Sequence, residues 1–120
     1  MTRCEITGVR DLTFSGWVRA KLPDSKTGFL VSDLDWILYN YKTKTLMLIE
    51  VKTRSKQLAY WQESLFKLLD VSIRNGIPKE YTYLGFSTIV FENTFFTDGK
   101  CWLDGKEVSE QELIDILSLL

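Results

Sequence analysis

Two short apolar runs separated by a polar stretch form the most regular pattern in this chain. The first begins directly after Asp35, and the second covers residues 46–51. Each has the length and the aromatic or branched composition of a β-strand. We therefore expect an antiparallel hairpin with its turn at Lys42-Thr43. Asp35 then lies opposite Glu50, because both are equally distant from the turn.

This hairpin would gather charged side chains at its open end. Glu50 and Lys52 are two residues apart and share one face of their strand, while Val51 points to the other face. Facing carboxylates on Asp35 and Glu50 repel each other unless a proton or a cation lies between them. Hard divalent cations prefer such oxygen ligands. The pattern therefore predicts a site made of two carboxylates and one ammonium group.

Helical and turn signals flank the hairpin. Residues 7–22 have apolar positions at near-helical spacing, residues 23–28 have loop composition, and residues 29–31 suit a short strand. After the hairpin, Ser55 is the expected N-cap of a helix that ends at Asn75-Gly76. The expected buried face of that helix consists of Leu58, Trp61, Leu65, Leu68 and Leu69.

The C-terminal third predicts a strand, a hairpin and a helix. Residues 81–91 are rich in strand-forming residues. Asp98-Gly99 and Asp104-Gly105 are turn signals, which favour a small hairpin through residues 101–103. Ser109 and Glu112 have the spacing of a capping box, so we expect a last short helix that runs to the end of the chain.

These elements predict an α/β (α+β) fold with a mixed central sheet flanked by helices. We expect one domain over residues 1–120, with a core at about 7–91 and the hairpin and short helix as an addition at 92–120. A chain of 120 residues that is 45% apolar and 26% charged suits a single globular domain.

Composition indicates the cellular compartment that we expect for this chain. No apolar run approaches the roughly 18 residues that span a membrane, and the polar segment 1–10 does not resemble a signal peptide. Two cysteines, Cys4 and Cys101, make neither a disulfide framework nor a zinc cluster. We therefore expect a cytoplasmic protein with no membrane partner.

The chain contains no histidine, which excludes the usual Ser-His-Asp and Cys-His catalysis and His-ligated zinc. Chemistry near neutral pH must then use carboxylates, lysine, tyrosine, cysteine or a metal. Charge is unevenly distributed: residues 36–79 carry a net +5 although the whole chain carries −1. A basic segment that surrounds clustered acids suits a phosphodiester substrate together with a metal.

Asp35 followed by Glu50-x-Lys52 resembles the signature of the PD-(D/E)xK nuclease superfamily. The predicted helix-strand-strand-strand-helix-strand order is similar to the αβββαβ core of that superfamily, the restriction-endonuclease-like or Holliday-junction-resolvase-like core, over residues 29–91 with a weaker N-terminal helix. Leu34 stands where the pattern has proline. Gln62, followed four residues later by Phe66, is a second point of resemblance, because some branches place such a pair in this helix.

The resemblance implies metal-dependent hydrolysis of phosphodiester bonds in DNA, by an endonuclease that uses Mg²⁺ or Mn²⁺. Asp35 and Glu50 would bind the metal together with the Val51 backbone carbonyl, Lys52 would assist the attacking water, and Gln62 would hold that water or a phosphate oxygen. By analogy the protein would act as a homodimer and come from a phage or mobile element, in which case the compartment is the host cytoplasm.

Further residues could complete the site. Many relatives in this superfamily add an acid from the first helix, for which the candidates are Asp11 and Glu5. Asp33 lies two residues before Asp35 on the same strand face, so it is the alternative to Asp35 as the motif acid, a candidate additional acid, or a turn residue. Basic residues that could bind the nucleic-acid backbone are Lys42, Lys44, Arg54 and Lys56. Trp102 is the one tryptophan that we consider for base stacking.

Two other interpretations remain open. The chain could be a catalytically inactive nuclease-like module that binds DNA or protein, because fold does not determine function. It could also be an unrelated small α/β binding protein in which Glu50 and Lys52 form an ion pair at a sheet edge. RNA is not excluded as the nucleic-acid partner.

Overall fold

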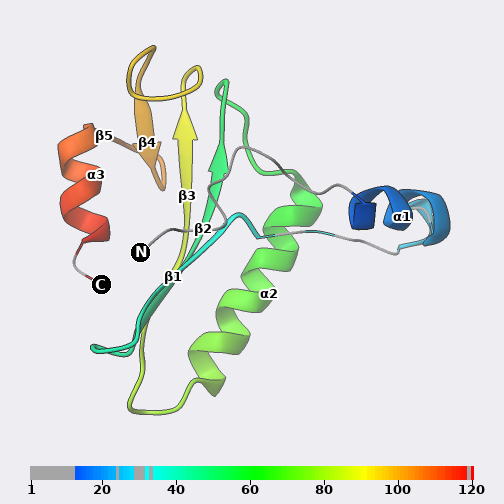
Figure 1. The fold of residues 1–120 in the computed structure, drawn as a ribbon, viewed down its shortest axis with the longest axis horizontal. Helices are drawn as coiled ribbons and strands as arrows, with labels where there is room; N and C mark the ends of the chain where they lie inside the picture. Colours follow the sequence, from blue (N-terminus) through cyan, green and yellow to red (C-terminus); the bar gives the residue numbers. More distant parts are fainter. Residues whose placement is uncertain (1–12, 24, 29–31, 33, 119) are drawn as a thin grey trace. The chain divides into compact units, whose positions relative to one another are not determined.

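The computed structural model describes residues 13–23, 25–28, 32, 34–118 and 120. Its contacts separate one compact unit that ends at Asp33 from a second that runs from Leu34 to Leu120, so the single domain expected over 1–120 stays a prediction. The elements, coloured along the chain in Figure 1, are α1 (Thr13–Lys21), the 3₁₀ helix η1 (Ser25–Thr27), β1 (Trp36–Asn40), β2 (Thr45–Lys52), α2 (Tyr60–Gly76), β3 (Thr82–Phe91), β4 (Cys101–Leu103), β5 (Lys106–Val108) and α3 (Glu110–Leu117).

The first unit contains α1 and η1. The aromatic rings of Phe14 and Trp17 stack on the surface of α1 with their centroids 5.7 Å apart, as their spacing of three residues allows. The helix expected over residues 7–22 is confirmed for 13–21, and its earlier part lies outside the described residues. The short strand expected at residues 29–31 also lies outside them.

The second unit is built on a mixed five-stranded sheet with the order β1-β2-β3-β4-β5. β2 and β3 are parallel, and the other neighbouring pairs are antiparallel. The parallel pair requires a crossover, which α2 provides. The sequence-based prediction of a mixed sheet flanked by helices is therefore confirmed.

The register of the β1–β2 hairpin is the expected one. Trp36 pairs with Ile49 and Asn40 pairs with Thr45, so the turn is centred between Lys42 and Thr43. The Asn40 side-chain oxygen accepts hydrogen bonds from the backbone N–H groups of Lys42 and Thr43, at 2.9 and 3.2 Å. This local bonding fixes the turn and hence the register of every residue along the hairpin.

A bulge between β2 and β3 decides which β3 side chains face α2. Leu46 pairs with Tyr83 but Leu48 pairs with Phe86, so β3 has one extra residue here. Gly85 lies in the bulge with a φ of 98°, which favours glycine. Because side chains alternate along a strand, the extra residue changes the face on which all later β3 residues lie.

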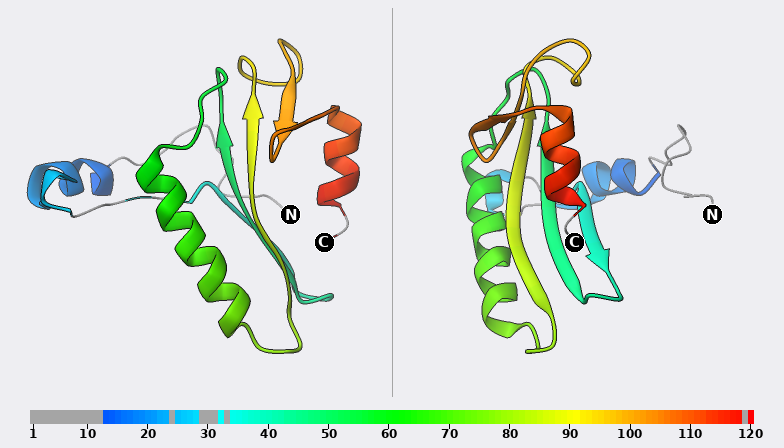
Figure 2. Two further views of the ribbon diagram at one scale, coloured as in Figure 1. Left: turned by 180° about the vertical axis from the view of Figure 1, so that it is seen from behind. Right: turned by 90° about the vertical axis from the view of Figure 1, so that its left-hand side faces the viewer.

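Helices pack on both faces of the sheet, as the two views in Figure 2 show. On the α2 face, the ring of Phe66 packs on that of Phe86 with centroids 4.8 Å apart. On the α3 face, the buried apolar cluster comprises Met47, Ile49, Ile89, Phe91, Cys101, Val108 and Leu113. Alternation along β2 therefore directs Met47 and Ile49 to α3, and Leu48 and Glu50 to α2.

The start and the buried face of α2 differ from the prediction. The N-cap is Ala59 rather than Ser55, whose own N–H donates to the Phe91 carbonyl oxygen at 2.9 Å in a turn where its φ is 55°. Of the predicted buried face, Trp61, Leu68 and Leu69 are exposed. The stripe that faces the sheet instead consists of Gln62, Phe66 and Asp70. Gln62 contacts Lys52, Phe66 contacts Phe86, and Asp70 contacts Tyr83. Two of its three members are polar, so an apolar pattern does not reveal it.

The end of α2 and the C-terminal elements agree with the prediction. α2 ends at Gly76, directly before Ile77-Pro78. β4 and β5 form a hairpin about Asp104-Gly105, where Gly105 has a φ of 85°. The Ser109 hydroxyl accepts from the Glu112 N–H at 3.1 Å, and the Glu112 carboxylate accepts from the Ser109 N–H at 3.0 Å. This capping box opens α3 as expected, but the helix ends at Leu117, with Ser118 as its C-cap, rather than running to the end of the chain.

Within the part of the chain that the structure describes, no helix has both the length and the apolar character needed to cross a bilayer.

Candidate functional site

Asp35 and Glu50 are in direct contact at the open end of the β1–β2 hairpin. The Asp35 N–H donates to Glu50 Oε2 at 3.3 Å, and the Val51 N–H donates to Asp35 Oδ2 at 3.0 Å. The hairpin register, continued by one residue beyond Trp36 and Ile49, brings these two acids opposite each other. The predicted juxtaposition of the two carboxylates is therefore confirmed.

Lys52 lies on the same face as Glu50 and joins it to helix α2. Its ammonium nitrogen is 4.0 Å from Glu50 Oε1 and donates to Gln62 Oε1 at 3.1 Å. The same Gln62 oxygen accepts from the Ala59 N–H at 3.3 Å at the start of α2. Gln62 therefore fixes the lysine head group relative to the helix N-terminus, and four of the predicted site residues form one connected cluster.

Glu50 is a buried acid, with 4% of its surface exposed. Burial, followed by the negative charge of Asp35, raises the pKa of Glu50 to about 7. The hydrogen bond from the Asp35 N–H and the charge of Lys52 act in the opposite direction without cancelling the rise. Near neutral pH the pair therefore favours taking up a proton or binding a cation.

The cluster suits a hard divalent cation. Glu50 Oε1 and Asp35 Oδ1 are not used by the two backbone hydrogen bonds, so both can act as ligands. The Val51 N–H points toward Asp35, and the carbonyl of a strand residue points to the same side as its N–H. Mg²⁺ keeps several waters and is often bound through one or two carboxylates. The donor set fits such an ion.

A third acid is not seen at this site in the described residues. There, no group of three or more histidine, cysteine, aspartate or glutamate residues is close enough together to hold a metal ion. The candidates for an additional acid, Asp33, Asp11 and Glu5, lie outside the described residues.

The predicted nucleic-acid-binding residues separate into two groups. Arg54 and Lys56 follow β2 in an exposed turn, at the same strand end as Glu50 and Lys52. Lys42 and Lys44 lie in the opposite turn, roughly 20 Å away at about 3.3 Å per strand residue. The structure therefore brings only Arg54 and Lys56 to the site end of the sheet.

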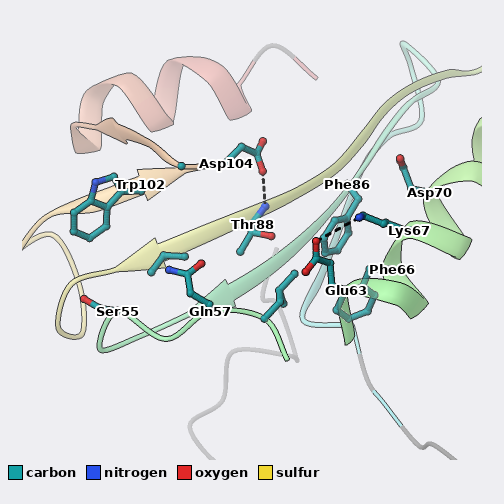
Figure 3. Close-up of a pocket in the computed structure, with 13 residues that line it drawn as sticks. Ser55, Gln57, Glu63, Phe66, Lys67, Asp70, Phe86, Thr88, Trp102 and Asp104 are labelled. Carbon is teal, nitrogen blue, oxygen red and sulfur yellow. Dashed lines mark hydrogen bonds and ion pairs between the residues drawn. The ribbon is translucent and has the colours of Figure 1, made fainter. Parts of the chain in front are cut away.

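A groove of about 700 Å³ lies between α2, β3 and the β4–β5 hairpin (Figure 3). Thr88 and Val90 of β3 line it, and their parallel partners on β2 are Glu50 and Lys52. Trp102 and Asp104 line it from the β4–β5 hairpin. Sequence reasoning considered Trp102 but missed Thr88 and Asp104. Thr88 reaches the site by pairing with Glu50 on another strand, and Asp104 reaches it through its hydrogen bonds to Thr88. The Asp104-Gly105 turn signal was the only local hint.

Comparison with known proteins finds no matching family model, no similar curated protein and no similar solved structure. The function must therefore be argued from the geometry of the site.

Proposed function

We propose that this chain is a metal-dependent phosphodiesterase that hydrolyses DNA, as an endonuclease with a PD-(D/E)xK-type site. One observation carries the proposal: Asp35, Glu50, Lys52 and Gln62 form one connected cluster at a single sheet end, in which Glu50 is buried and Asp35 is exposed. A surface ion pair alone would leave Glu50 exposed and its pKa close to the ordinary value.

The acid pair would hold the metal. Glu50 Oε1, Asp35 Oδ1 and the Val51 carbonyl are the protein oxygens available for Mg²⁺ or Mn²⁺. When bound, such an ion lowers the pKa of a coordinated water and neutralises charge on the phosphate. Because Glu50 is buried beside Asp35, a cation also relieves the repulsion between the two carboxylates.

Lys52 would act on the reacting phosphate. Its ammonium group has three N–H donors, of which one is directed to Gln62 and one lies close to Glu50. The third can donate to the attacking water or to a phosphoryl oxygen, where a fixed positive charge stabilises the developing negative charge. The Gln62 carbonyl oxygen is used by Lys52 and Ala59, which leaves its NH₂ group to donate to the same phosphate or water.

The test is cleavage of a labelled panel that contains duplex, single strand, flap, four-way junction and RNA, with Mg²⁺ or Mn²⁺ and with chelator. Glu50→Ala and Lys52→Ala should each lower the cleavage rate by at least a hundredfold and leave the circular dichroism spectrum unchanged. Glu80→Ala and Lys79→Ala are matched controls, because both residues are exposed in the turn between α2 and β3. If the metal-supplemented protein cleaves none of these substrates, the proposal is wrong.

One observation favours a second candidate, an inactive nuclease-like module that binds DNA or protein. Among the described residues the site has two acids rather than three. Calorimetry separates the two candidates. A nuclease binds Mn²⁺ through Asp35 and Glu50, whereas an inactive module binds nucleic acid equally well in chelator and shows no heat of metal binding.

A further inference from the structure

The groove beside the acid cluster continues the site across the sheet. Paired residues of neighbouring strands lie on the same face, so two rows cross the sheet under α2. Lys52 pairs with Val90, which pairs with Trp102, and Glu50 pairs with Thr88. Trp102 is therefore two strand spacings from Lys52, roughly 10 Å. One nucleotide spans such a distance from its phosphate to the far edge of its base.

The floor of the groove is apolar and its rim is polar. Phe66, Phe86 and Val90 supply apolar surface, and the half-buried Trp102 closes the end nearest β4 (Figure 3). Asp104 is fixed at the rim, because its Oδ1 accepts from the Thr88 N–H at 2.9 Å and its own N–H donates to the Thr88 carbonyl oxygen at 2.9 Å. Among the described residues, Asp104 Oδ2 has no hydrogen-bond partner, so it can accept an N–H group from a ligand.

The charges in the groove decide which part of a nucleic acid it can take. In the described part of the chain, its lining includes Glu63, Asp70 and Asp104 but only one cationic residue, Lys67. Lys67 lies 3.4 Å from Glu63 in an exposed ion pair, so a carboxylate accompanies the one lysine of the lining. A phosphate in the groove would be repelled by these carboxylates. A neutral base with N–H donors at its edge would not, and carboxylates are known acceptors for such edges.

We propose that the groove receives an unstacked base of a single-stranded stretch of the substrate, with Trp102 as its stacking surface and Asp104 as the acceptor for its N–H edge. The attached phosphate then lies toward Lys52 and the acid pair. This inference rests on the proposed function and makes it more specific: the substrate is single-stranded nucleic acid, or a duplex with an unpaired segment, rather than a continuous duplex.

The experiment is fluorescence anisotropy of the full chain in chelator, with a fluorescein-labelled 15-nucleotide strand of mixed sequence. The same strand as a blunt duplex and an all-abasic strand of equal length are the comparison probes. Trp102→Ala should weaken binding of the single strand by about 5- to 100-fold and leave binding of the abasic strand unchanged. Trp102→Phe should restore most of the affinity. Tyr41→Ala, an exposed aromatic in the turn between β1 and β2, should bind like wild type.

Several outcomes overturn the inference. It is wrong if wild type and Trp102→Ala bind the single strand with equal affinity, or if Trp102→Ala loses as much affinity for the abasic strand as for the normal strand. It is also wrong if wild type prefers the blunt duplex or binds none of the probes. If thermal unfolding shows that Trp102→Ala does not fold, Trp102→Leu replaces it, since it fills the site without an aromatic face.

The two proposals fail in distinguishable ways. If Trp102 is required for single-strand binding but the protein cleaves nothing with Mg²⁺ or Mn²⁺, the groove is a base-binding site and the hydrolytic function is wrong. The opposite result is that wild type cleaves the nucleic acid, Glu50→Ala does not, and Trp102→Ala binds every probe as wild type does. In that case the hydrolytic function stands and the groove inference is wrong.

Discussion

Asp35 and Glu50 hold each other in place across the end of the β1–β2 hairpin. The Asp35 N–H donates to Glu50 Oε2, and Asp35 Oδ2 accepts from the Val51 N–H that follows Glu50. Each acid thus has one oxygen fixed by backbone and one oxygen left for a ligand. Because the backbone holds both side chains in place, the two carboxylates stay close together when no cation is bound.

The first prediction concerns metal affinity. Asp35→Asn and Glu50→Gln each remove one anionic ligand and keep the size of the side chain. Each should weaken Mn²⁺ binding at least tenfold in isothermal titration calorimetry, while Glu80→Gln, at an exposed turn, should not change it. Unchanged affinity in both site variants would show that the cation binds elsewhere or not at all.

The second prediction concerns pH and stability without metal. In the folded chain, burial and the charge of Asp35 raise the pKa of Glu50 from its ordinary value of 4.5 to about 7. Between these values the folded state binds more protons than the unfolded state, so unfolding free energy falls as pH rises through this window. In chelator the melting temperature should therefore fall from pH 5 to pH 8, and Glu50→Gln should remove most of the slope.

Two other acids with shifted pKa values, Asp98 and Glu112, do not produce a fall in stability over this pH window. Hydrogen bonds from Thr94 and Phe95 lower the pKa of Asp98, and the capping bonds from Ser109 lower that of Glu112. These groups stabilise the fold above their unfolded pKa, and that stabilisation is lost only as the pH falls below it. A wild-type melting temperature that rises or stays constant from pH 5 to pH 8 in chelator would contradict the assignment to Glu50.

The third prediction separates Lys52 from Gln62. Lys52→Ala removes the only ammonium group within 4.0 Å of the Glu50 carboxylate among the described residues, and should lower the single-turnover cleavage rate by about 100- to 1,000-fold. Gln62→Ala leaves that charge in place but removes its hydrogen-bond partner, so we expect a loss of about tenfold. Equal losses of rate in the two variants would mean that the position of the Lys52 ammonium group, rather than its charge, limits the reaction.

The fourth prediction tests the fold away from the site. Ser109→Ala removes the N-cap oxygen of α3 and should lower unfolding free energy by about 1 kcal/mol in urea denaturation. Cleavage and Mn²⁺ affinity should stay at the wild-type level, because α3 packs on the opposite face from Glu50 and Lys52. A loss of metal affinity in this variant would mean that the two faces are coupled.

The acid cluster could be predicted from sequence because it depends on short-range rules. A hairpin with a symmetric turn places Asp35 opposite Glu50, and the two-residue period places Lys52 on the face of Glu50. Gln62 came from the resemblance alone, and its contact with Lys52 agrees with that assignment.

The groove and the face of α2 could not be predicted because they depend on long-range packing. The bulge at Gly85 changes the face of every later β3 residue, and no periodic pattern signals a bulge in advance. Helix α2 presents Gln62 and Asp70 to the sheet because both find polar partners there, in Lys52 and Tyr83. A hydrophobicity pattern counts these residues as solvent-facing, so it assigned the wrong stripe.

The most direct test of the central claim compares cation binding with catalysis in the same protein. Mn²⁺ is titrated against wild type by calorimetry, and the single-turnover cleavage rate of a labelled DNA substrate is measured over the same Mn²⁺ concentrations. We predict that the rate reaches half its maximum at the concentration that half-fills the site, and that Glu50→Gln abolishes both signals together. Cleavage that persists in Glu50→Gln, or that saturates at a concentration unrelated to binding, would contradict a catalytic metal held by Asp35 and Glu50.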